Sequence, residues 1–300
     1  MEQTLLLNAS YEPLKIVHWQ KAVMLWCQGK VEVISVYDRE VRAVSFSFKL
    51  PSVIRLLRYI NIKKRFDYVP FSRANIYARD PMTMAACRST LAEAYPGRFV
   101  LGLGVSHRHL VTGVRKHDYS RPLSYMRQYL DGMDQALFMA HKPAEEAPTV
   151  LAALGPKMLE LSATRTAGAH PYFTTPEHTA YSRQVMGEGP LLAPEQMVVL
   201  STDPTEARTI ARAGMAVYLR APNYLNNLAR LGFDESDWAD HTNASDRLVD
   251  AVVAWGTAEQ IATRVKAHHD AGADHVCIQV LRSDRNLPID EWAELAGVLL

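Results

Sequence analysis

The sequence predicts an α/β protein built from a small α+β segment at residues 1–80 and a parallel sheet or (β/α) barrel at residues 81–300. Three observations lead to this fold class. The composition of the chain changes near Asp80. Runs of β-forming residues surround a helix before that point. After it, short apolar strands alternate with helices, which is the pattern of parallel β/α folds.

The change in composition at Asp80 involves charge, glycine and histidine. Residues 1–80 hold 13 Lys and Arg against 7 Asp and Glu, whereas residues 81–300 hold 20 against 25. Of the 15 glycines and 11 histidines, all but one of each type fall after Asp80. An asymmetry of this kind is typical of two units with different roles. We therefore predict domains at residues 1–80 and 81–300.

Charge and cysteine content exclude several classes of protein. The formal net charge of +1 means that any attraction to nucleic acid must be local to the N-terminal part. Cys27, Cys87 and Cys277 are widely spaced, which disfavours a disulfide framework and a Cys-rich zinc site and fits a reducing compartment. No apolar run reaches the roughly 18–20 residues of a membrane helix. We expect a cytoplasmic protein without a metal site or a membrane partner.

The N-terminal part is predicted to hold three strands and two helices. The strands are expected at residues 4–7, 31–36 and 41–46. One helix is expected at residues 18–28, because Gly29 is a stop signal. The segment from Tyr37 to Glu40 separates the second and third strands as a hairpin turn. Pro51 suits a first helical position and predicts the second helix at residues 52–59.

A basic stretch ends this part, and its cations are Arg55, Arg58, Lys63, Lys64 and Arg65. Such a stretch is most simply a solvated surface. Clustered Lys and Arg beside aromatic side chains are also what contacts to a nucleic-acid backbone require. The candidate nucleic-acid patch under this alternative consists of Arg58, Lys63, Lys64 and Arg65.

Four motifs in this part resemble a known leader sequence. They are L-L-L-N-A-S-Y-E-P-L, Y-D-R-E-V-R, L-P-S-V-I-R-L-L-R-Y and V-P-F-S-R-A-N-I-Y-A-R-D. Over residues 3–80 they resemble the N-terminal region of bacterial HNH endonucleases. In that family a zinc-supported nuclease core follows, with C-x-x-C and His-Asn-His. Here Pro81-Met82-Thr83-Met84 follows instead. The resemblance implies a leader without nuclease activity, because the metal and the His base of that chemistry have no residues to supply them.

From Pro81 onwards, helices and strands are predicted to alternate. Helices are expected at residues 81–95, 120–141 and 257–271, with further helices opening at Pro156, at Thr175-Pro176 and at Asp203-Pro204. Strands are expected at residues 99–105, 150–154, 169–173, 197–201 and 275–281. That makes five strands, and a closed TIM-type (β/α)8 barrel has eight.

Motifs in family order over residues 75–281 resemble the luciferase-like monooxygenase class. They are closest to its coenzyme F420-dependent oxidoreductases, and they include Y-P-G-R-F-V-L-G-L-G-V-S-H, V-L-A-A-L-G-P-K-M-L-E-L and G-A-H-P-Y-F-T-T-P-E-H-T. In that class about three strand–helix units precede A-N-I-Y-A-R-D. The resemblance implies an incomplete TIM (β/α)8-type barrel that lacks its first strands. Both families carry a segment close to A-N-I-Y-A-R-D, so the chain is expected to be a chimera of the two families joined within residues 74–80. The junction could be natural, engineered or a sequence artefact.

Barrel active sites lie at the carboxyl ends of the strands. After the second predicted strand, Gly155-Pro156-Lys157-Met158 is either an ordinary turn or a helix N-terminus that binds phosphate. The resemblance implies the second role, with Ser106 from the preceding strand end as a further contact to the cofactor. His107, next to Ser106, could move a proton near neutral pH or could lie on a surface loop. The resemblance places this strand end near the cofactor ring and makes His107 the catalytic candidate.

Three further strand-end residues are candidates for a substrate pocket: His170, Tyr172 and Gln279. The alternative is that they only fill the mouth of the barrel. By resemblance the chain is an oxidoreductase that transfers hydride between coenzyme F420, or alternatively FMN, and a small-molecule substrate. A truncated barrel would impair that activity, and its open edges invite association, so a homodimer could cover part of them. The alternatives are a DNA-binding remnant and a fusion product without function.

Overall fold

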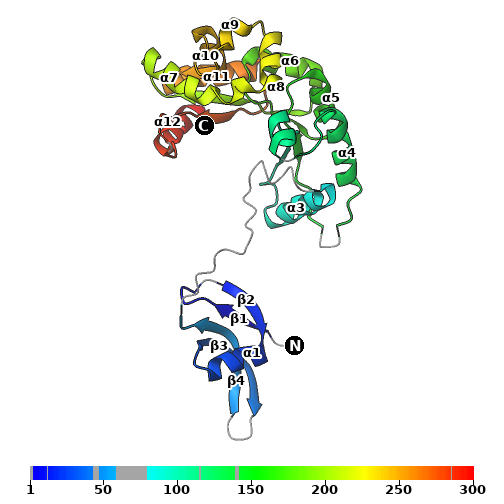
Figure 1. Ribbon diagram of the computed structural model, residues 1–300, viewed down its shortest axis with the longest axis vertical. Helices are drawn as coiled ribbons and strands as arrows, with labels where there is room; N and C mark the ends of the chain where they lie inside the picture. Colours follow the sequence, from blue (N-terminus) through cyan, green and yellow to red (C-terminus); the bar gives the residue numbers. More distant parts are fainter. Residues whose placement is uncertain are drawn as a thin grey trace. The chain divides into compact units, whose positions relative to one another are not determined.

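The computed structural model describes residues 3–11, 13–42, 47–58, 80–114, 116–138, 142–284 and 286–300. The chain divides into two compact units, Met1–Pro70 and Phe71–Leu300, here called unit 1 and unit 2 (Figure 1). The predicted junction at residues 74–80 lies outside the described residues except for Asp80.

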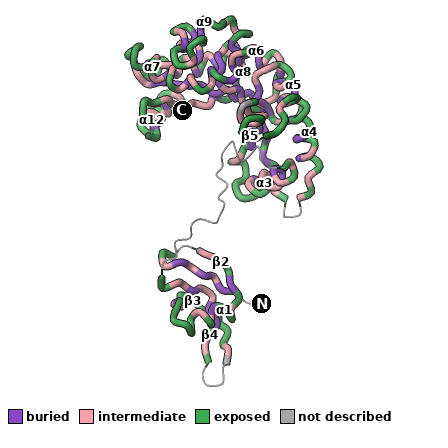
Figure 2. The backbone as a smooth tube through the Cα atoms, in the orientation of Figure 1, coloured by how far each residue is buried: buried purple, intermediate pink, exposed green. Residues whose placement is uncertain are grey.

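The described residues of unit 1 form a four-stranded mixed sheet with one helix. Its elements are β1 (Gln3–Leu7), β2 (Pro13–His18), α1 (Trp19–Cys27), β3 (Val31–Arg42) and β4 (Ser47–Leu56). The strand order is β2-β1-β4-β3, with β1 and β4 parallel and the other pairs antiparallel. A small core is formed by Leu6, Val17, Ala22, Val31 and Ile54. Figure 2 shows the buried parts of this unit in purple on α1 and on the strands. The predicted α+β segment is thus present.

Two predictions for unit 1 are wrong. The segment from Tyr37 to Glu40 is no turn, because β3 runs through it. Pro51 opens no helix, and the predicted helix is instead the central strand β4. Two neighbouring strands satisfy the hydrogen bonds of β4, and Pro51 lies where the register with β3 shifts, so its missing N–H is tolerated. Its carbonyl accepts a 2.6 Å hydrogen bond from Thr4 Oγ1. The prediction also missed β2.

The strands described in unit 2 are parallel to one another and fall into two groups. The first has the order β5-β6-β7-β8, with bounds Leu101–Leu103, Thr149–Leu151, Gly168–Ala169 and Leu191–Leu192. The second has the order β10-β9-β11, with bounds Val253–Trp255, Glu195–Val199 and Cys277–Val280. All five predicted strands are confirmed, with β8 an extension of the fourth. The strand β10 was not predicted.

The two groups belong to one continuous sheet. Past the end of β7, the Ala193 N–H still donates to the Ala169 carbonyl, and the Glu195 N–H donates to the Pro171 carbonyl. On the other side of the same chain segment, Asp274 and Cys277 donate to Leu192 and Pro194. The course of the sheet is therefore β5, β6, β7, β8 with β9, and β11, whereas β10 pairs with the carboxyl-terminal part of β9 and departs from chain order.

Helices follow the strands in the same order. The main ones are α3 (Pro81–Ala94), α4 (Pro122–Asp134), α5 (Pro156–Arg165), α6 (Pro176–Met186), α7 (Pro204–Met215), α11 (Ala258–Asp270) and α12 (Ile289–Leu299). Contacts run from α3 through α4, α5, α6 and α11 to α12, and Figure 1 shows α4, α5 and α6 following one another along one side of unit 2. The helix predicted at residues 120–141 is shorter than expected, ending at Asp134 with Leu137 exposed beyond it.

A helical section joins β9 to β10 and was largely unpredicted. After α7 it contains η2 (Tyr218–Arg220), α8 (Pro222–Arg230), α9 (Glu235–Trp238) and α10 (Asp246–Val252). Its apolar side chains share one core with Phe173 after β7 and with Met197 and Val199 of β9. This packing holds α8 beside the carboxyl ends of the strands. Within the described residues, no helix has the length and apolar character needed to cross a membrane.

Candidate functional site

The end of β5 carries Ser106 and His107 on a constrained turn. Ser106 has φ 62°, a left-handed conformation that is uncommon for a residue other than glycine. Its carbonyl accepts a 2.7 Å hydrogen bond from the hydroxyl of Tyr119, which holds the turn in place. His107 follows, and its Nδ1 lies 3.1 Å from Oδ1 of Asn223. Its ring centroid is 5.5 Å from that of Tyr224.

The end of β6 leads into the first turn of α5. Gly155 is the N-cap residue, and no side chain caps this helix N-terminus. A Cβ atom built on Gly155 would lie 3.4 Å from Nη1 of Arg230, so the guanidinium sits over this part of the backbone. Lys157 is exposed in the first turn. A bare helix N-terminus beside two cations favours an anion.

Beneath this turn, the carbonyl of Leu154 is held by a histidine of α6. Nε2 of His178 lies 2.9 Å from that oxygen. Burial lowers the pKa of the His178 imidazole; the bond to Leu154 opposes this effect, and the charge of Arg230 adds to it. His178 is therefore neutral near pH 7. On the other side of the turn, Met158 packs into the core next to α5.

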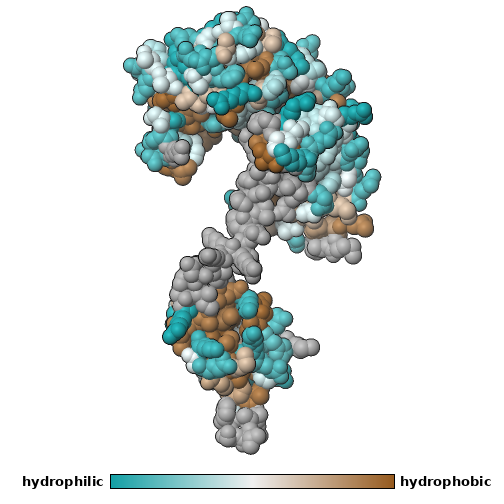
Figure 3. All heavy atoms as spheres, viewed as in Figure 1, coloured by the Kyte–Doolittle hydropathy of each residue, from teal (hydrophilic) through white to brown (hydrophobic). Residues whose placement is uncertain are grey.

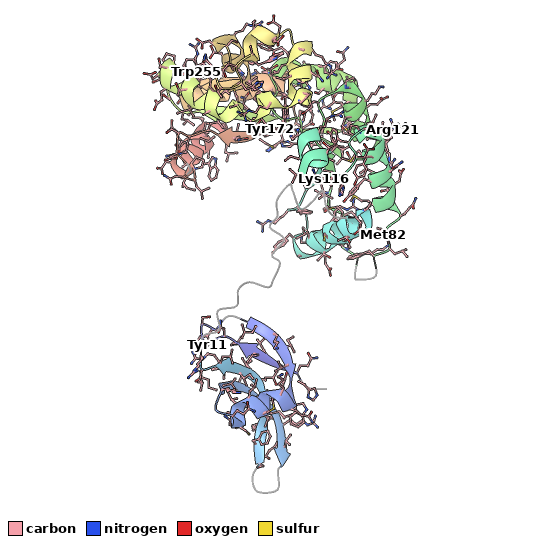
Figure 4. The ribbon with its side chains drawn as sticks, in the orientation of Figure 1. Tyr11, Met82, Lys116, Arg121, Tyr172 and Trp255 are labelled. Atoms are coloured by element: carbon pink, nitrogen blue, oxygen red, sulfur yellow. The ribbon has the colours of Figure 1, made fainter. Side chains whose placement is uncertain are left out.

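The structure brings Tyr172 and Gln279 together from the ends of β7 and β11. The Tyr172 hydroxyl donates to Oε1 of Gln279 and lies 2.7 Å from the hydroxyl of Tyr218. Figure 4 labels the position of Tyr172. His170, the third residue predicted for a substrate pocket, is turned toward the sheet. Its Nδ1 lies 2.6 Å from the carbonyl oxygen of Ala193. The two groups of predicted residues, Ser106 with His107 and Tyr172 with Gln279, are linked through Tyr224, whose ring centroid is 6.4 Å from that of Tyr172.

Helix α8 supplies the contacts that the sequence analysis missed. Its first turn carries Asn223 and Tyr224 against His107, and its last residue, Arg230, lies over Gly155. Seven residues at 1.5 Å each separate the two ends by about 10 Å along the helix axis. A signal existed, because Pro222 marks a helix start and the buried Tyr224, Asn227 and Leu228 follow with helical spacing.

The candidate nucleic-acid patch is only partly within the described residues. Arg58 is described and exposed, whereas Lys63, Lys64 and Arg65 lie outside. Arg55 is engaged, because its side chain pairs with Glu32 and stacks 4.5 Å from the ring centroid of Tyr11. The described surface of unit 1 also exposes large apolar side chains, which include Ile16, Met24, Trp26, Ile34 and Leu57. Figure 3 shows brown, hydrophobic atoms on the visible face of this unit.

Among the described residues there is no group of three or more His, Cys, Asp and Glu side chains that could hold a metal ion.

Two protein families match the chain. The family described as HNH endonuclease-associated, N-terminal domain, matches residues 4–64. The family described as luciferase-like monooxygenase matches residues 71–275. Both resemblances seen in the sequence motifs are thereby confirmed. The comparison with curated proteins gives no match.

Several solved structures share the fold over about three quarters of the chain. An F420-dependent secondary alcohol dehydrogenase, in complex with an F420–acetone adduct, is 15% identical with a TM-score of 0.59, covering 74% of this chain and 76% of its own. The coenzyme F420-dependent tetrahydromethanopterin reductase of Methanopyrus kandleri is 16% identical with a TM-score of 0.55, covering 74% and 78%. The oxygenating constituent of 3,6-diketocamphane monooxygenase of Pseudomonas putida, in complex with FMN, is 14% identical with a TM-score of 0.50, covering 73% and 74%.

At these identities the likeness concerns the fold alone. The family match is the stronger statement, because it spans residues 71–275 of a 300-residue chain and so more than half of it. The chain therefore belongs to the luciferase-like monooxygenase family.

Proposed function

We propose that this chain is a hydride-transfer oxidoreductase that binds coenzyme F420, or alternatively FMN, along α8. The observation that carries the proposal is that one short helix places side chains beside both His107 and Gly155. Asn223 and Arg230 are about 10 Å apart along the axis of α8. A five-carbon ribityl chain, which joins the ring to the phosphate in both cofactors, bridges a comparable length. The residues at each end suit the corresponding part of such a molecule.

The phosphate end is the first turn of α5. Gly155 leaves its backbone open, Pro156 suits the first helical position, and Lys157 and Arg230 add positive charge. Met158 supports the turn from the core side. The ring end is the turn at Ser106 and His107. Hydride transfer is the chemistry that a flavin or deazaflavin supplies when bound, and the protein contributes orientation and proton transfer.

His107 is the residue we assign to proton transfer. With Oδ1 of Asn223 as the acceptor, Nδ1 of His107 carries the proton and Nε2 carries the lone pair. Asn223 thus selects the tautomer in which Nε2 can take a proton from a small-molecule substrate. The ring of Tyr172 lies near that of Tyr224, which also lies near His107, and the Tyr172 hydroxyl donates to Gln279. We therefore assign Tyr172 and Gln279 to the substrate pocket. His170 contacts the sheet instead and would support the pocket indirectly.

Two of the solved structures named above are F420-dependent and one holds FMN, which supports a cofactor of this kind. The test is a titration of the purified full chain with F420 and, separately, with FMN, followed by fluorescence. We expect saturable binding of one of them, weakened by Arg230→Ala and unchanged by Arg220→Ala, an exposed arginine just before α8. Failure to bind either one at concentrations on the order of tens of micromolar would refute the proposal.

We further propose that unit 2 is an incomplete eight-stranded barrel with impaired turnover. Support comes from the parallel course from β5 to β11, whose end strands each pair with a single strand among the described residues. Open parallel edges favour association, and a homodimer would cover them. Sedimentation of the purified chain tests this point, with a dimer or larger species expected and a monodisperse monomer as the contrary result.

A second candidate function, nucleic-acid binding by unit 1, is favoured by the match of residues 4–64 to the HNH endonuclease-associated domain. It predicts a salt-dependent shift of duplex DNA, because cations that neutralise phosphates release counterions. The triple variant Lys63→Ala, Lys64→Ala, Arg65→Ala should abolish the shift. A shift of equal size with this variant would exclude the patch.

A further inference from the structure

His178 lies in a buried polar group that the proposed function does not use. The residue is 1% exposed and comes from the first turn of α6. Its Nε2 lies 2.9 Å from the Leu154 carbonyl, and its Nδ1 lies 3.2 Å from the hydroxyl of Ser182. The neighbouring residue on the helix, Thr179, points elsewhere and contacts Nδ1 of His268 on α11 at 2.8 Å.

The hydrogen bonds determine the tautomer of His178. A carbonyl oxygen can only accept, so Nε2 carries the proton and donates it to Leu154. Nδ1 then has a lone pair, which accepts from the Ser182 hydroxyl. Both ring nitrogens are satisfied in the neutral form, as burial requires.

The carbonyl that His178 holds belongs to the peptide unit that begins the phosphate turn. The Leu154 C=O and the Gly155 N–H share one planar peptide, and in a trans peptide they point in opposite directions. All peptide bonds described here are trans. By fixing the Leu154 oxygen toward α6, His178 therefore directs the Gly155 N–H away from α6. Among the described residues no acceptor for that N–H is seen.

We propose that His178 is a positioning residue, which aims the Gly155 N–H of the α5 turn at the phosphate of the cofactor through its hydrogen bond to the Leu154 carbonyl. The inference rests on the proposed function, because it takes the α5 turn to be the phosphate site. It assigns a role in affinity to a side chain that does not touch the ligand.

Two substitutions of His178 test this role, and their side chains differ in how far they extend toward the Leu154 carbonyl. The amide nitrogen of Gln lies close to where Nε2 of His lies, so His178→Gln retains the donor to Leu154. In His178→Asn the amide is one methylene shorter and the donor is lost. Thr179→Val is the matched control, because it breaks an equally buried hydrogen bond of the same helix without touching Leu154. Binding of F420, FMN and inorganic phosphate is measured by calorimetry, and folding by circular dichroism.

We expect His178→Asn to weaken binding roughly threefold to tenfold, the effect of one lost hydrogen bond. His178→Gln and Thr179→Val should bind as the unchanged chain does, although Thr179→Val unfolds more easily. Equal affinity of a folded His178→Asn variant would overturn the inference, and so would equal weakening by Thr179→Val. If the unchanged chain binds none of the three ligands, the proposed function fails, and this inference fails with it.

A spectroscopic measurement keeps the inference testable if His178→Asn does not fold. In the unchanged chain labelled with ¹⁵N-histidine, the His178 imidazole should show the Nε2–H tautomer, and addition of phosphate should shift its resonances. The resonances of His268, which contacts Thr179 and Gln196 instead, should stay in place. An Nδ1–H tautomer of His178, or an equal shift at His268, would contradict the assignment.

Discussion

Protonation of His268 should destabilise unit 2 in mildly acidic solution. The imidazole is fully buried, with Nε2 2.9 Å from Oε1 of Gln196 and Nδ1 2.8 Å from the hydroxyl of Thr179. The amide nitrogen of Gln196 donates to the carbonyls of Met197 and Val252, so its oxygen must face the histidine. Nε2 of His268 therefore carries the proton, and Nδ1 accepts. A second proton would place a positive charge on a buried ring.

The size of the effect follows from the pKa of His268. Burial, assisted by the nearby charge of Arg264 and opposed by that of Glu177, lowers this pKa from 6.5 to about 4. At pH values between about 4 and 6.5, the unfolded chain therefore binds a proton at His268 and the folded chain does not. The free energy of unfolding is unaffected by this group above pH 6.5 and falls as the pH drops from 6.5 to about 4, by about 3 kcal/mol in total.

The assay is urea unfolding followed by far-UV circular dichroism from about pH 7 down to about pH 4.5. Carboxylates also titrate as the pH falls, so the informative quantity is the difference between the unchanged chain and His268→Gln. The unchanged chain should lose about 2 kcal/mol more than this variant over that range. His269→Gln is the matched control, since the adjacent His269 is exposed and its replacement leaves the buried ring of His268 in place. Parallel profiles for the unchanged chain and His268→Gln would refute the reasoning.

Three other substitutions or reactions probe the fold of unit 2. Gly168→Ala should prevent stable folding or strongly lower the urea midpoint of unfolding, because the new Cβ would lie 1.9 Å from the Leu191 carbonyl oxygen. A midpoint near that of the unchanged chain would contradict the close packing of Gly168 against Leu191. Asp203→Ala should lower the free energy of unfolding by about 1 kcal/mol, since this carboxylate caps two N–H groups at the start of α7. A decrease below a few tenths of a kcal/mol would argue against the cap. Burial raises the pKa of the Cys277 thiol, so iodoacetamide should alkylate Cys277 more slowly than the exposed Cys27. Mass spectrometry of timed samples measures the alkylation of both cysteines, and equal rates would contradict the burial of Cys277.

The starts of the helices in unit 2 were predictable because their signals are local. Proline at the first helical position preceded by a capping residue occurs at Asp80-Pro81, Thr175-Pro176 and Asp203-Pro204, and each side chain accepts from the first turn of its helix. The same residue type misled the prediction at Pro51. There the pairing of β4 with β1 and β3, together with a shift in register, outweighs the local preference.

The candidate site divides in the same way. The sequence could select five site residues because they lie near the ends of predicted strands or just after them, and parallel strands bring their carboxyl ends to one side. These residues are Ser106, His107, Gly155, Tyr172 and Gln279. That rule could not tell that His170 contacts the Ala193 carbonyl. It also could not find Asn223, which is 116 residues from His107 and belongs to a helical section with no strand to mark it.

By itself the sequence determined the two-part organisation, the five parallel strands, the helix starts and the strand-end residues, because periodicity and capping act over a few residues. Only the tertiary structure decided that β4 is a strand, that α8 joins His107 to Gly155, and that His178 holds the peptide before Gly155. These outcomes depend on contacts between residues far apart in the chain. Burial and pairing across such distances set the free energy of each contact, and the local sequence does not encode them.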